Sequence, residues 1–375
     1  MSEIDSDQLF DVVVVGAGTA GIGVAAALRQ ADIHNFVVLE RETVAASFDA
    51  WPAETRLITP SFPTNSFGML DLNSVALGVS PGYSLESEHP TGAEYAAHLR
   101  AVADFFKLPI REGEDVKGIT RSDDSFRIEA SSGPLLARHV IWAAGEFQYP
   151  RRFCFTGSNL CRHTATIERF SDLEGDDFIV IGGYESGIDA AFHLAWYDKR
   201  IRVFDRSAPW ESTSSDPSIA LSPFTLERMR EDWFCEQVEL FPDTPITAVE
   251  RAESGYRVIA ADGTVHTCET APLWAGGFEG SHMLLTNLFE LRSDGFPKLT
   301  DQDESTIAPG LFLCGPSVRH DNHIFCFIYK YRQRFAVVAR AIANDLGLEA
   351  HGLETYRSWG MYLDDLSTCG ERCVC

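Results

Sequence analysis

Residues 10–40, FDVVVVGAGTAGIGVAAALRQADIHNFVVLE, predict a strand, a tight glycine turn, a helix and a second strand. Gly16 lets the chain leave the first strand sharply, and Gly18 has no side chain to keep a pyrophosphate away from the backbone. Gly21 lets the helix pack close to the strand. Glu40 follows about 20 residues later, where a carboxylate accepts hydrogen bonds from a ribose diol. The pattern predicts a dinucleotide site, because incidental glycines would leave Glu40 unexplained.

The same pattern returns between residues 177 and 206, which predicts a second dinucleotide site. The second strand ends in Asp205 and Arg206, two residues that favour different cofactors. Asp205 stands where Glu40 stands in the first unit and favours the free 2′-hydroxyl of NADH, whereas Arg206 could clamp the 2′-phosphate of NADPH. We favour NADPH, with NADH as the alternative. The turn residues expected to bind this nucleotide are Gly182, Gly183, Ser186 and Gly187.

The composition limits the classes of protein to consider. A chain of 375 residues suits two domains, and 45% hydrophobic residues can bury a sizeable core. The net charge of −24 argues against a nucleic-acid or anionic-membrane partner. No apolar run approaches the roughly 20 residues of a membrane span, and the first ten residues do not resemble a signal peptide. Nine scattered cysteines do not form a secreted disulfide framework, so we expect reduced thiols in the cytoplasm.

Four features stand in order along the chain and together resemble a known superfamily. They are GAGTAG with Glu40, VIWAAGEFQYP (140–150), VIGGYESGIDAA (180–191), and PLWAGGF (272–278) followed by PGLFLCGP (309–316). They resemble the flavoproteins with two dinucleotide-binding domains, which include thioredoxin reductases, bacilliredoxin reductases and single-component flavin monooxygenases. The resemblance covers nearly the whole chain to about Leu346. It implies FAD at the first site, NAD(P)H at the second, and hydride transfer between them.

The resemblance also implies an architecture. The expected fold is α/β, with two Rossmann-like domains and the NAD(P)H domain inserted into the FAD domain. We expect the FAD domain at residues 1–150 and 276–346, the NAD(P)H domain at 151–275, and a C-terminal extension with a cysteine-rich tail at 347–375. The family's Ala-Thr-Gly motif is Ala-Ala-Gly here and ends at Gly145. Its Gly-Asp motif, which binds the flavin ribityl chain, is Gly-Pro here and begins at Gly315, so both glycines join the predicted FAD site.

Three stretches look most like the flavin monooxygenases within this superfamily: RLITPSFP, HPTGAEYAAHLRAVADFF and RRFCFTGSNLCRH. The last resembles the monooxygenase fingerprint F-x-G-x-x-x-H through Phe155, Gly157 and His163, although His163 lies two residues late. Asn65 resembles the asparagine that those enzymes place over the flavin. The alternative for Asn65 is a turn asparagine that bonds its own backbone. The resemblance implies a monooxygenase that delivers an oxygen atom to a small, soft nucleophile.

The chain ends in TCGERCVC, with Cys369, Cys373 and Cys375 inside seven residues. Thiols beside a terminus can reach an active site, and Arg372 would favour the thiolate of Cys373. These cysteines are the second set of candidate catalytic residues. The alternatives are a soft metal or metalloid site and cysteines without a role. The spacing fits no standard zinc pattern, so we predict no metal site.

The sequence therefore leaves three functions open. We favour a monooxygenase of the single-component flavin type. The second function is a thioredoxin reductase-like enzyme that reduces a disulfide or a thiol–metalloid compound through the cysteine tail. The third is a flavin-based redox or metal sensor. Each implies a small-molecule substrate or a small thiol or disulfide as partner, and a homodimer is compatible with all three.

Overall fold

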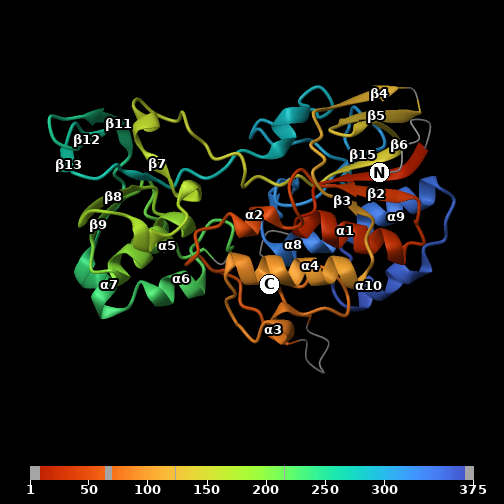
Figure 1. Ribbon diagram of the computed structural model, residues 1–375, viewed down its shortest axis with the longest axis horizontal. Helices are drawn as coiled ribbons and strands as arrows, with labels where there is room; N and C mark the ends of the chain where they lie inside the picture. Colours follow the sequence, from red (N-terminus) through yellow and green to blue (C-terminus); the bar gives the residue numbers. More distant parts are fainter. Residues whose placement is uncertain (1–8, 64–69, 123, 215, 368–375) are drawn as a thin grey trace.

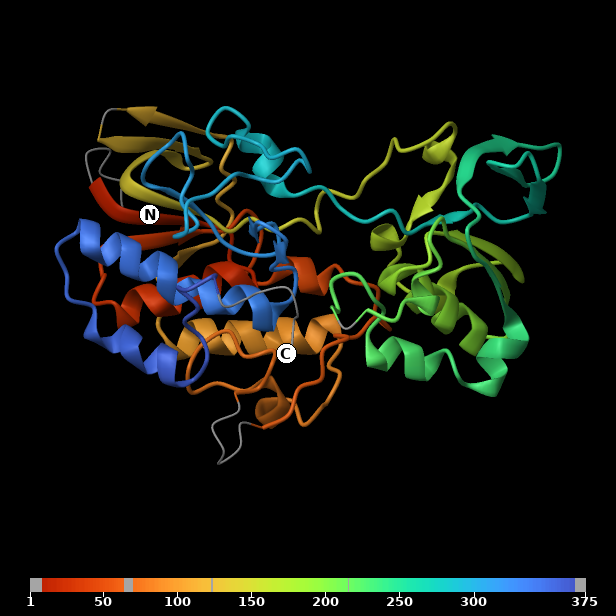
Figure 2. The ribbon, with the colours of Figure 1, turned by 180° about the vertical axis from the view of Figure 1, so that it is seen from behind.

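The computed structural model of the chain describes residues 9–63, 70–122, 124–214 and 216–367. The chain folds into two lobes that lie side by side along the longest axis of the molecule (Figure 1). Each lobe has a parallel or mainly parallel β-sheet with helices beside it. Two segments connect the lobes, and residues 149–151 pair there with residues 277–279 (Figures 1 and 2). The chain thus leaves the larger lobe once and returns to it.

Within the described residues, a seven-stranded sheet forms the centre of the larger lobe. Its strands are β1 (Leu9–Val15), β2 (Phe36–Leu39), β3 (Ile110–Arg111), β4 (Gly118–Ser122), β5 (Ser125–Ala130), β6 (Gly133–Trp142) and β15 (Leu311–Leu313). Their order is β3-β2-β1-β6-β5-β4, with β15 paired to β6. β1 runs parallel to β2 and β6, whereas β4, β5 and β6 pair antiparallel. Residues 12–15, all valine, are buried, as expected for a strand covered on both faces.

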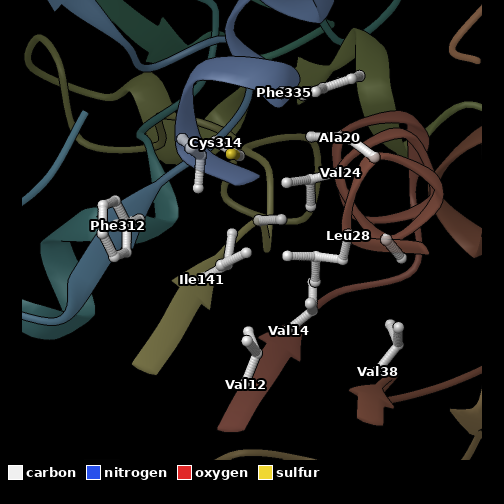
Figure 3. Close-up of a cluster of buried hydrophobic side chains, with 14 of the residues drawn as sticks. Val12, Val14, Ala20, Val24, Leu28, Val38, Ile141, Phe312, Cys314 and Phe335 are labelled. Atoms are coloured by element: carbon white, nitrogen blue, oxygen red, sulfur yellow. The ribbon is translucent and has the colours of Figure 1, made fainter. Parts of the chain in front are cut away.

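The helices of the larger lobe cover one face of this sheet (Figure 2). They are α1 (Thr19–Gln30), α2 (Ala46–Asp49), α3 (Pro81–Ser84), α4 (Gly92–Phe105), α8 (Ile328–Tyr331), α9 (Phe335–Asp345) and α10 (Glu354–Ser358). α1 and α9 pack closely because Gly23 has no side chain: a Cβ there would lie 2.1 Å from the Phe335 ring. Figure 3 shows Phe335 beside Ala20 and Val24 of α1, on the side away from the strand residues. The core therefore lies between the sheet and these helices.

Within the described residues, the smaller lobe contains a five-stranded sheet and a three-stranded sheet. The first has the order β10-β9-β8-β14-β7 and is parallel throughout: β7 (Arg162–His163), β8 (Asp177–Ile181), β9 (Arg200–Phe204), β10 (Val238–Phe241) and β14 (Leu273–Trp274). The second is antiparallel: β11 (Ile246–Arg251), β12 (Tyr256–Ala260) and β13 (Val265–Cys268). The helices are α5 (Glu185–Trp196), α6 (Pro223–Arg228) and α7 (Asp232–Gln237).

Short elements complete the fold. The hairpin β16 (Arg319–His320) and β17 (His323–Ile324) follows β15. Short 3₁₀ helices lie at Ser158–Leu160, Thr164–Thr166, Phe170–Asp172, Pro209–Glu211, Ser281–Leu285, Arg332–Arg334 and His351–Leu353. In the described parts of the chain, no helix has both the length and the apolar character to cross a bilayer. The predicted α/β fold with two Rossmann-like sheets is confirmed, and the domain boundaries stay a prediction.

Candidate active site

The first glycine turn has the geometry that its spacing predicts. Gly16 has a φ of +101°, and its N–H donates to the Leu39 carbonyl at 2.8 Å. A Cβ at Gly16 would lie 2.6 Å from the Ala143 carbonyl oxygen, and a Cβ at Gly21 would lie 1.8 Å from that of Gly16. Gly18 differs, because a Cβ there would meet no atom within 4 Å. Two glycines thus allow close backbone packing, while Gly18 keeps a space open in front of the turn.

Glu40 is held against this turn by the backbone. Its Oε2 accepts a hydrogen bond from the Ala17 N–H at 2.8 Å, and its Oε1 accepts one from the Glu42 N–H at 2.9 Å. Each carboxylate oxygen can accept a second hydrogen bond, so two hydroxyl groups could still bind. An open space at the turn beside a fixed carboxylate fits the pyrophosphate and ribose of a dinucleotide.

A cavity of about 720 Å³ runs from this turn to the smaller lobe, and residues of both lobes line it. Four aromatic rings follow one another along its wall. The ring centroids of Phe48 and Trp51 are 4.9 Å apart, those of Trp51 and Phe147 are 6.4 Å apart, and those of Phe147 and Phe278 are 5.2 Å apart. Such a wall suits a planar aromatic ligand.

Most residues predicted to bind FAD border this cavity. Gly16, Gly18, Glu40 and Gly145 line it, whereas Gly21 and Gly315 do not. Gly145 has a φ of +65°, and its carbonyl accepts the Ser281 N–H at 3.0 Å. Pro316, which replaces the family's aspartate, also lines the cavity. The residues present therefore fit FAD, which would supply a hydride acceptor when bound.

The second glycine turn repeats the first. Gly182 has a φ of +100°, and its N–H donates to the Phe204 carbonyl at 2.8 Å. A Cβ at Gly182 would lie 2.6 Å from the Ala275 carbonyl oxygen, and a Cβ at Gly187 would lie 1.8 Å from that of Gly182. Ser186 lines the cavity together with Tyr184 and Glu185, whereas the predicted glycines Gly182, Gly183 and Gly187 do not. This backbone geometry fits a second dinucleotide.

One position of the second turn departs from the first. Tyr184 stands where Gly18 stands, and its hydroxyl lies 2.9 and 2.8 Å from the carbonyl oxygens of Pro217 and Ala220. This contact directs the ring toward the loop that precedes α6. Arg206 is exposed and lies outside the cavity lining. The sequence predicted the turn but gave no role to Tyr184.

Two polar side chains in the cavity were missed by the sequence reasoning. Glu146 follows Gly145 directly and lines the cavity; burial raises the pKa of its carboxyl, opposed by Arg319 and Arg151. Asn73 is 1% exposed, its Nδ2 donates to Thr59 O and Ser61 Oγ at 2.8 Å, and its Oδ1 has no partner among the described residues. The position of Glu146 after the strand-end glycine was a usable signal, whereas Asn73 lies in an irregular segment without one.

A cysteine side chain also lines the cavity. Within residues 9–63, 70–122, 124–214 and 216–367, Cys326 is the only cysteine that lines the cavity. Its Sγ lies 3.2 Å from Ser218 Oγ, and burial raises the pKa of the thiol. The four predicted catalytic residues, Asn65, Cys369, Cys373 and Cys375, lie outside the described residues.

The residues of the monooxygenase-like fingerprint lie beside the cavity rather than in it. Phe155 packs edge-on against Trp274 with ring centroids 5.1 Å apart. A Cβ at Gly157 would lie 1.8 Å from the Val249 carbonyl oxygen, so this glycine is required by packing. His163 Nε2 lies 3.1 Å from the Gly277 carbonyl oxygen. In this structure the three residues make packing contacts and hydrogen bonds in the smaller lobe and beside the segment by which the chain returns to the larger lobe.

Each lobe thus has a glycine turn of the dinucleotide type, one after β1 and one after β8, and a cavity with an aromatic wall lies between the two turns. This arrangement is that of a protein with two nucleotide-binding lobes. Residues 13–315 match the profile of the pyridine nucleotide-disulphide oxidoreductase family, and the chain belongs to that family.

Curated relatives are distant. An uncharacterized CzcO-like oxidoreductase of Geobacillus kaustophilus is 27% identical over 198 residues, which cover 50% of this chain and 52% of the relative. An FAD-dependent urate hydroxylase of Xanthomonas campestris is 27% identical over 225 residues, or 54% of this chain and 46% of the relative. The chain thus spans about half the length of the first curated relatives it matches.

Solved structures show the same fold over almost their full length. Bacillithiol disulfide reductase Bdr (YpdA) from Staphylococcus aureus matches with a TM-score of 0.73 and 17% identity, over 90% of this chain and 99% of that chain. A flavin-containing monooxygenase from Stenotrophomonas maltophilia matches with a TM-score of 0.70 and 18% identity, also over 90% and 99%. At 17% and 18% identity, the likeness concerns the fold alone.

Proposed function

We propose that this protein is an FAD-dependent monooxygenase that uses NAD(P)H and acts on a small, soft nucleophile. FAD occupies the first turn through Gly16, Gly18, Gly21 and Glu40, with Gly145 and Gly315 beside it. NAD(P)H occupies the second turn. The net reaction consumes NAD(P)H, a proton, O₂ and the substrate S, and releases NAD(P)⁺, water and the oxygenated product SO.

The observation that carries this proposal is the aromatic cavity, which is lined by a single cysteine of the described residues. A disulfide reductase needs a nucleophilic thiolate or a dithiol next to the flavin. Burial raises the pKa of Cys326, which favours the unreactive thiol, and no second cysteine lines the cavity within the described residues. Oxygen transfer instead depends on excluding water, which the four-ring wall from Phe48 to Phe278 supports.

Asn73 is our candidate for a polar group that orients the bound ring or the substrate. Its Oδ1 is buried without a partner in the described chain, and the side chain lines the cavity. A buried acceptor without a donor costs about 1–3 kcal/mol, which a ligand with an N–H or O–H group would offset. Asn65 keeps the same role as a prediction, since it lies outside the described residues.

Turnover under ¹⁸O₂ tests the proposal most directly. The FAD-loaded protein is supplied with NAD(P)H and a panel of thioethers, amines and ketones, and products are analysed by mass spectrometry. The proposal predicts a product with an ¹⁸O atom and NAD(P)H consumption that matches product formation. Faster NAD(P)H oxidation by small disulfides under anaerobic conditions, without any oxygenated product in air, would contradict it.

A second candidate is a disulfide or thiol–metalloid reductase, favoured by the family's disulphide oxidoreductase description and by the three cysteines near residue 375. Replacing Cys369, Cys373 and Cys375 by serine separates the two functions. The reductase requires that anaerobic disulfide turnover be lost in this variant. The monooxygenase requires unchanged oxygenation. A redox or metal sensor would show slow turnover with every acceptor in both forms.

A further inference from the structure

Asp205, directly after β9, directs its carboxylate back onto the second glycine turn. Its Oδ2 accepts a hydrogen bond from the Gly183 N–H at 2.7 Å. Its Oδ1 accepts one from the Ser207 N–H at 2.8 Å and one from Ser207 Oγ at 3.0 Å. Three donors therefore fix this carboxylate beside the turn, although its neighbour Ser207 is exposed.

The arrangement repeats that of Glu40 in the first turn. Both carboxylates bond to the N–H of the second turn residue, Ala17 or Gly183, with the oxygen–nitrogen distances at 2.8 and 2.7 Å. Both also bond to the N–H two residues further along the chain. Because a carboxylate in this place receives the ribose diol of a dinucleotide, Asp205 holds the diol-binding position of the second site.

The turn is adapted to the shorter side chain of aspartate. A Cβ at Gly183 would lie 3.1 Å from the Asp205 Cβ and 2.3 Å from the Trp210 ring. Ala17 carries a Cβ at the matching position of the first turn, where the acid is a glutamate one methylene longer. Gly183 therefore leaves room for both the Trp210 ring and the Asp205 side chain beside the turn.

Arg206, the residue expected to bind a 2′-phosphate, is not held in place by hydrogen bonds as Asp205 is. Its side chain is exposed, and it makes no hydrogen bond or ion pair with any other described residue. The fixed carboxylate of Asp205 would repel a 2′-phosphate on the bound nucleotide. The Arg206 side chain could attract that phosphate only after losing conformational entropy.

We infer that the second turn selects NADH over NADPH and that Asp205 is the residue that determines this specificity. The sequence alone favoured NADPH through Arg206; the hydrogen bonds of Asp205 favour the free 2′-hydroxyl. A hydroxyl donates to a carboxylate, but a phosphate brings no donor and a like charge. This inference rests on the proposed function, because it takes the second turn as the site of the reducing nucleotide.

Equilibrium binding of NAD⁺ and NADP⁺ to the FAD-loaded, full-length protein tests the inference without turnover. Calorimetry should give a Kd for NADP⁺ at least about tenfold above that for NAD⁺, the ratio expected from a lost hydrogen bond to a charged group. Asp205→Asn should bring the two Kd values to within about threefold, since the amide keeps an acceptor for Gly183 but loses the charge. Arg206→Ala is the matched control and should leave the wild-type ratio unchanged.

The outcomes separate the inference from the proposed function. Wild-type protein that binds NADP⁺ as tightly as NAD⁺, or more tightly, would overturn the inference and leave the proposed function standing. The inference also fails if Asp205→Asn keeps the wild-type ratio while its FAD content and circular dichroism match the wild type. If neither nucleotide binds and neither NADH nor NADPH bleaches the flavin, the proposed function itself fails.

Discussion

Thr55 Oγ1 donates a hydrogen bond of 2.7 Å to Asp189 Oδ2, which joins the two lobes through a buried carboxylate. The second oxygen, Oδ1, lies 2.8 Å from Arg228 Nη1 and 3.3 Å from His193 Nε2. Burial alone would raise the pKa of Asp189, but the nearby His193 ring, the charge of Arg228 and the hydrogen bond from Thr55 hold it below its usual value. The contact therefore keeps an ionised carboxylate at the boundary of the cavity.

Asp189→Asn should lower the free energy of unfolding by about 3–5 kcal/mol, because it leaves the Arg228 guanidinium buried without its counter-charge. Urea unfolding at pH 7 measures this loss. The wild type should also lose stability as the pH falls below about 4, since a carboxyl with a lowered pKa takes up a proton when the chain unfolds.

The asparagine variant should lack that part of the acid dependence. Thr55→Ser keeps the hydroxyl donor and serves as the control, with an expected change within about 0.5 kcal/mol. Equal stability of Asp189→Asn and wild type at pH 7 would show that the ion pair contributes little.

Gly18→Ala should separate FAD binding from folding. A Cβ at residue 18 meets no atom within 4 Å, so the free energy of unfolding without FAD should change by no more than about 0.5 kcal/mol. FAD affinity should fall, because the methyl group would occupy the space in front of the turn. Fluorescence titration with FAD measures the affinity, and unchanged affinity would argue that the pyrophosphate lies elsewhere.

Gly21→Ala should instead lower the free energy of unfolding of the protein without FAD. Its Cβ would lie 1.8 Å from the Gly16 carbonyl oxygen, so helix α1 would have to move away from the strand. Overpacking of this kind costs roughly 1–3 kcal/mol. Thermal unfolding without FAD measures the cost, and a Gly21→Ala protein as stable as Gly18→Ala would contradict the packing argument.

The reactivity of Cys326 should respond in opposite directions to two neighbouring charges. Burial raises the pKa of this thiol; Lys330 and Arg319 oppose the increase, whereas Glu146 adds to it. Glu146→Gln should therefore speed alkylation of Cys326 by iodoacetamide at pH 8, and Lys330→Met should slow it. Peptide mass spectrometry follows the labelling, and equal rates in both variants would show that neither charge reaches the thiol.

Phe278→Ala should uncouple NAD(P)H oxidation from oxygenation. The Phe278 ring continues the aromatic wall from Phe147, and its removal opens a gap of side-chain size through which water can enter. More hydrogen peroxide should be released per NAD(P)H consumed, while FAD content stays that of the wild type. A peroxide assay measures the release. If NAD(P)H oxidation stays fully coupled to oxygenation in this variant, residues other than Phe278 exclude water.

Local patterns were enough to predict the two turns. Gly16 and Gly182 adopt φ values of +101° and +100°, and a Cβ at either would meet a carbonyl oxygen at 2.6 Å. The glycines are therefore required by the local backbone conformation, which a sequence pattern can indicate. Glu40 and Asp205 were predictable for the same reason, because strand and helix lengths fix their distance from the turn. The fold class followed from the repeat of this unit.

The inner cavity could not be predicted in this way. Asn73 and Cys326 come from irregular segments far apart in the sequence, and only pairing of distant parts of the chain brings both to one cavity. Tyr184 and Thr55 likewise act through partners 33 or more residues away. Hydrophobic periodicity in the sequence does not indicate such contacts. The polar lining of the cavity and the contact between the lobes were therefore visible only in the structure.

The visible spectrum of the purified protein, before and after addition of NADH, tests the central claim that one chain carries both a flavin site and a nicotinamide site. The account predicts a yellow protein with FAD close to equimolar with the chain, which NADH bleaches without oxygen and air restores. A well-folded protein that is colourless and takes up no added FAD would contradict it.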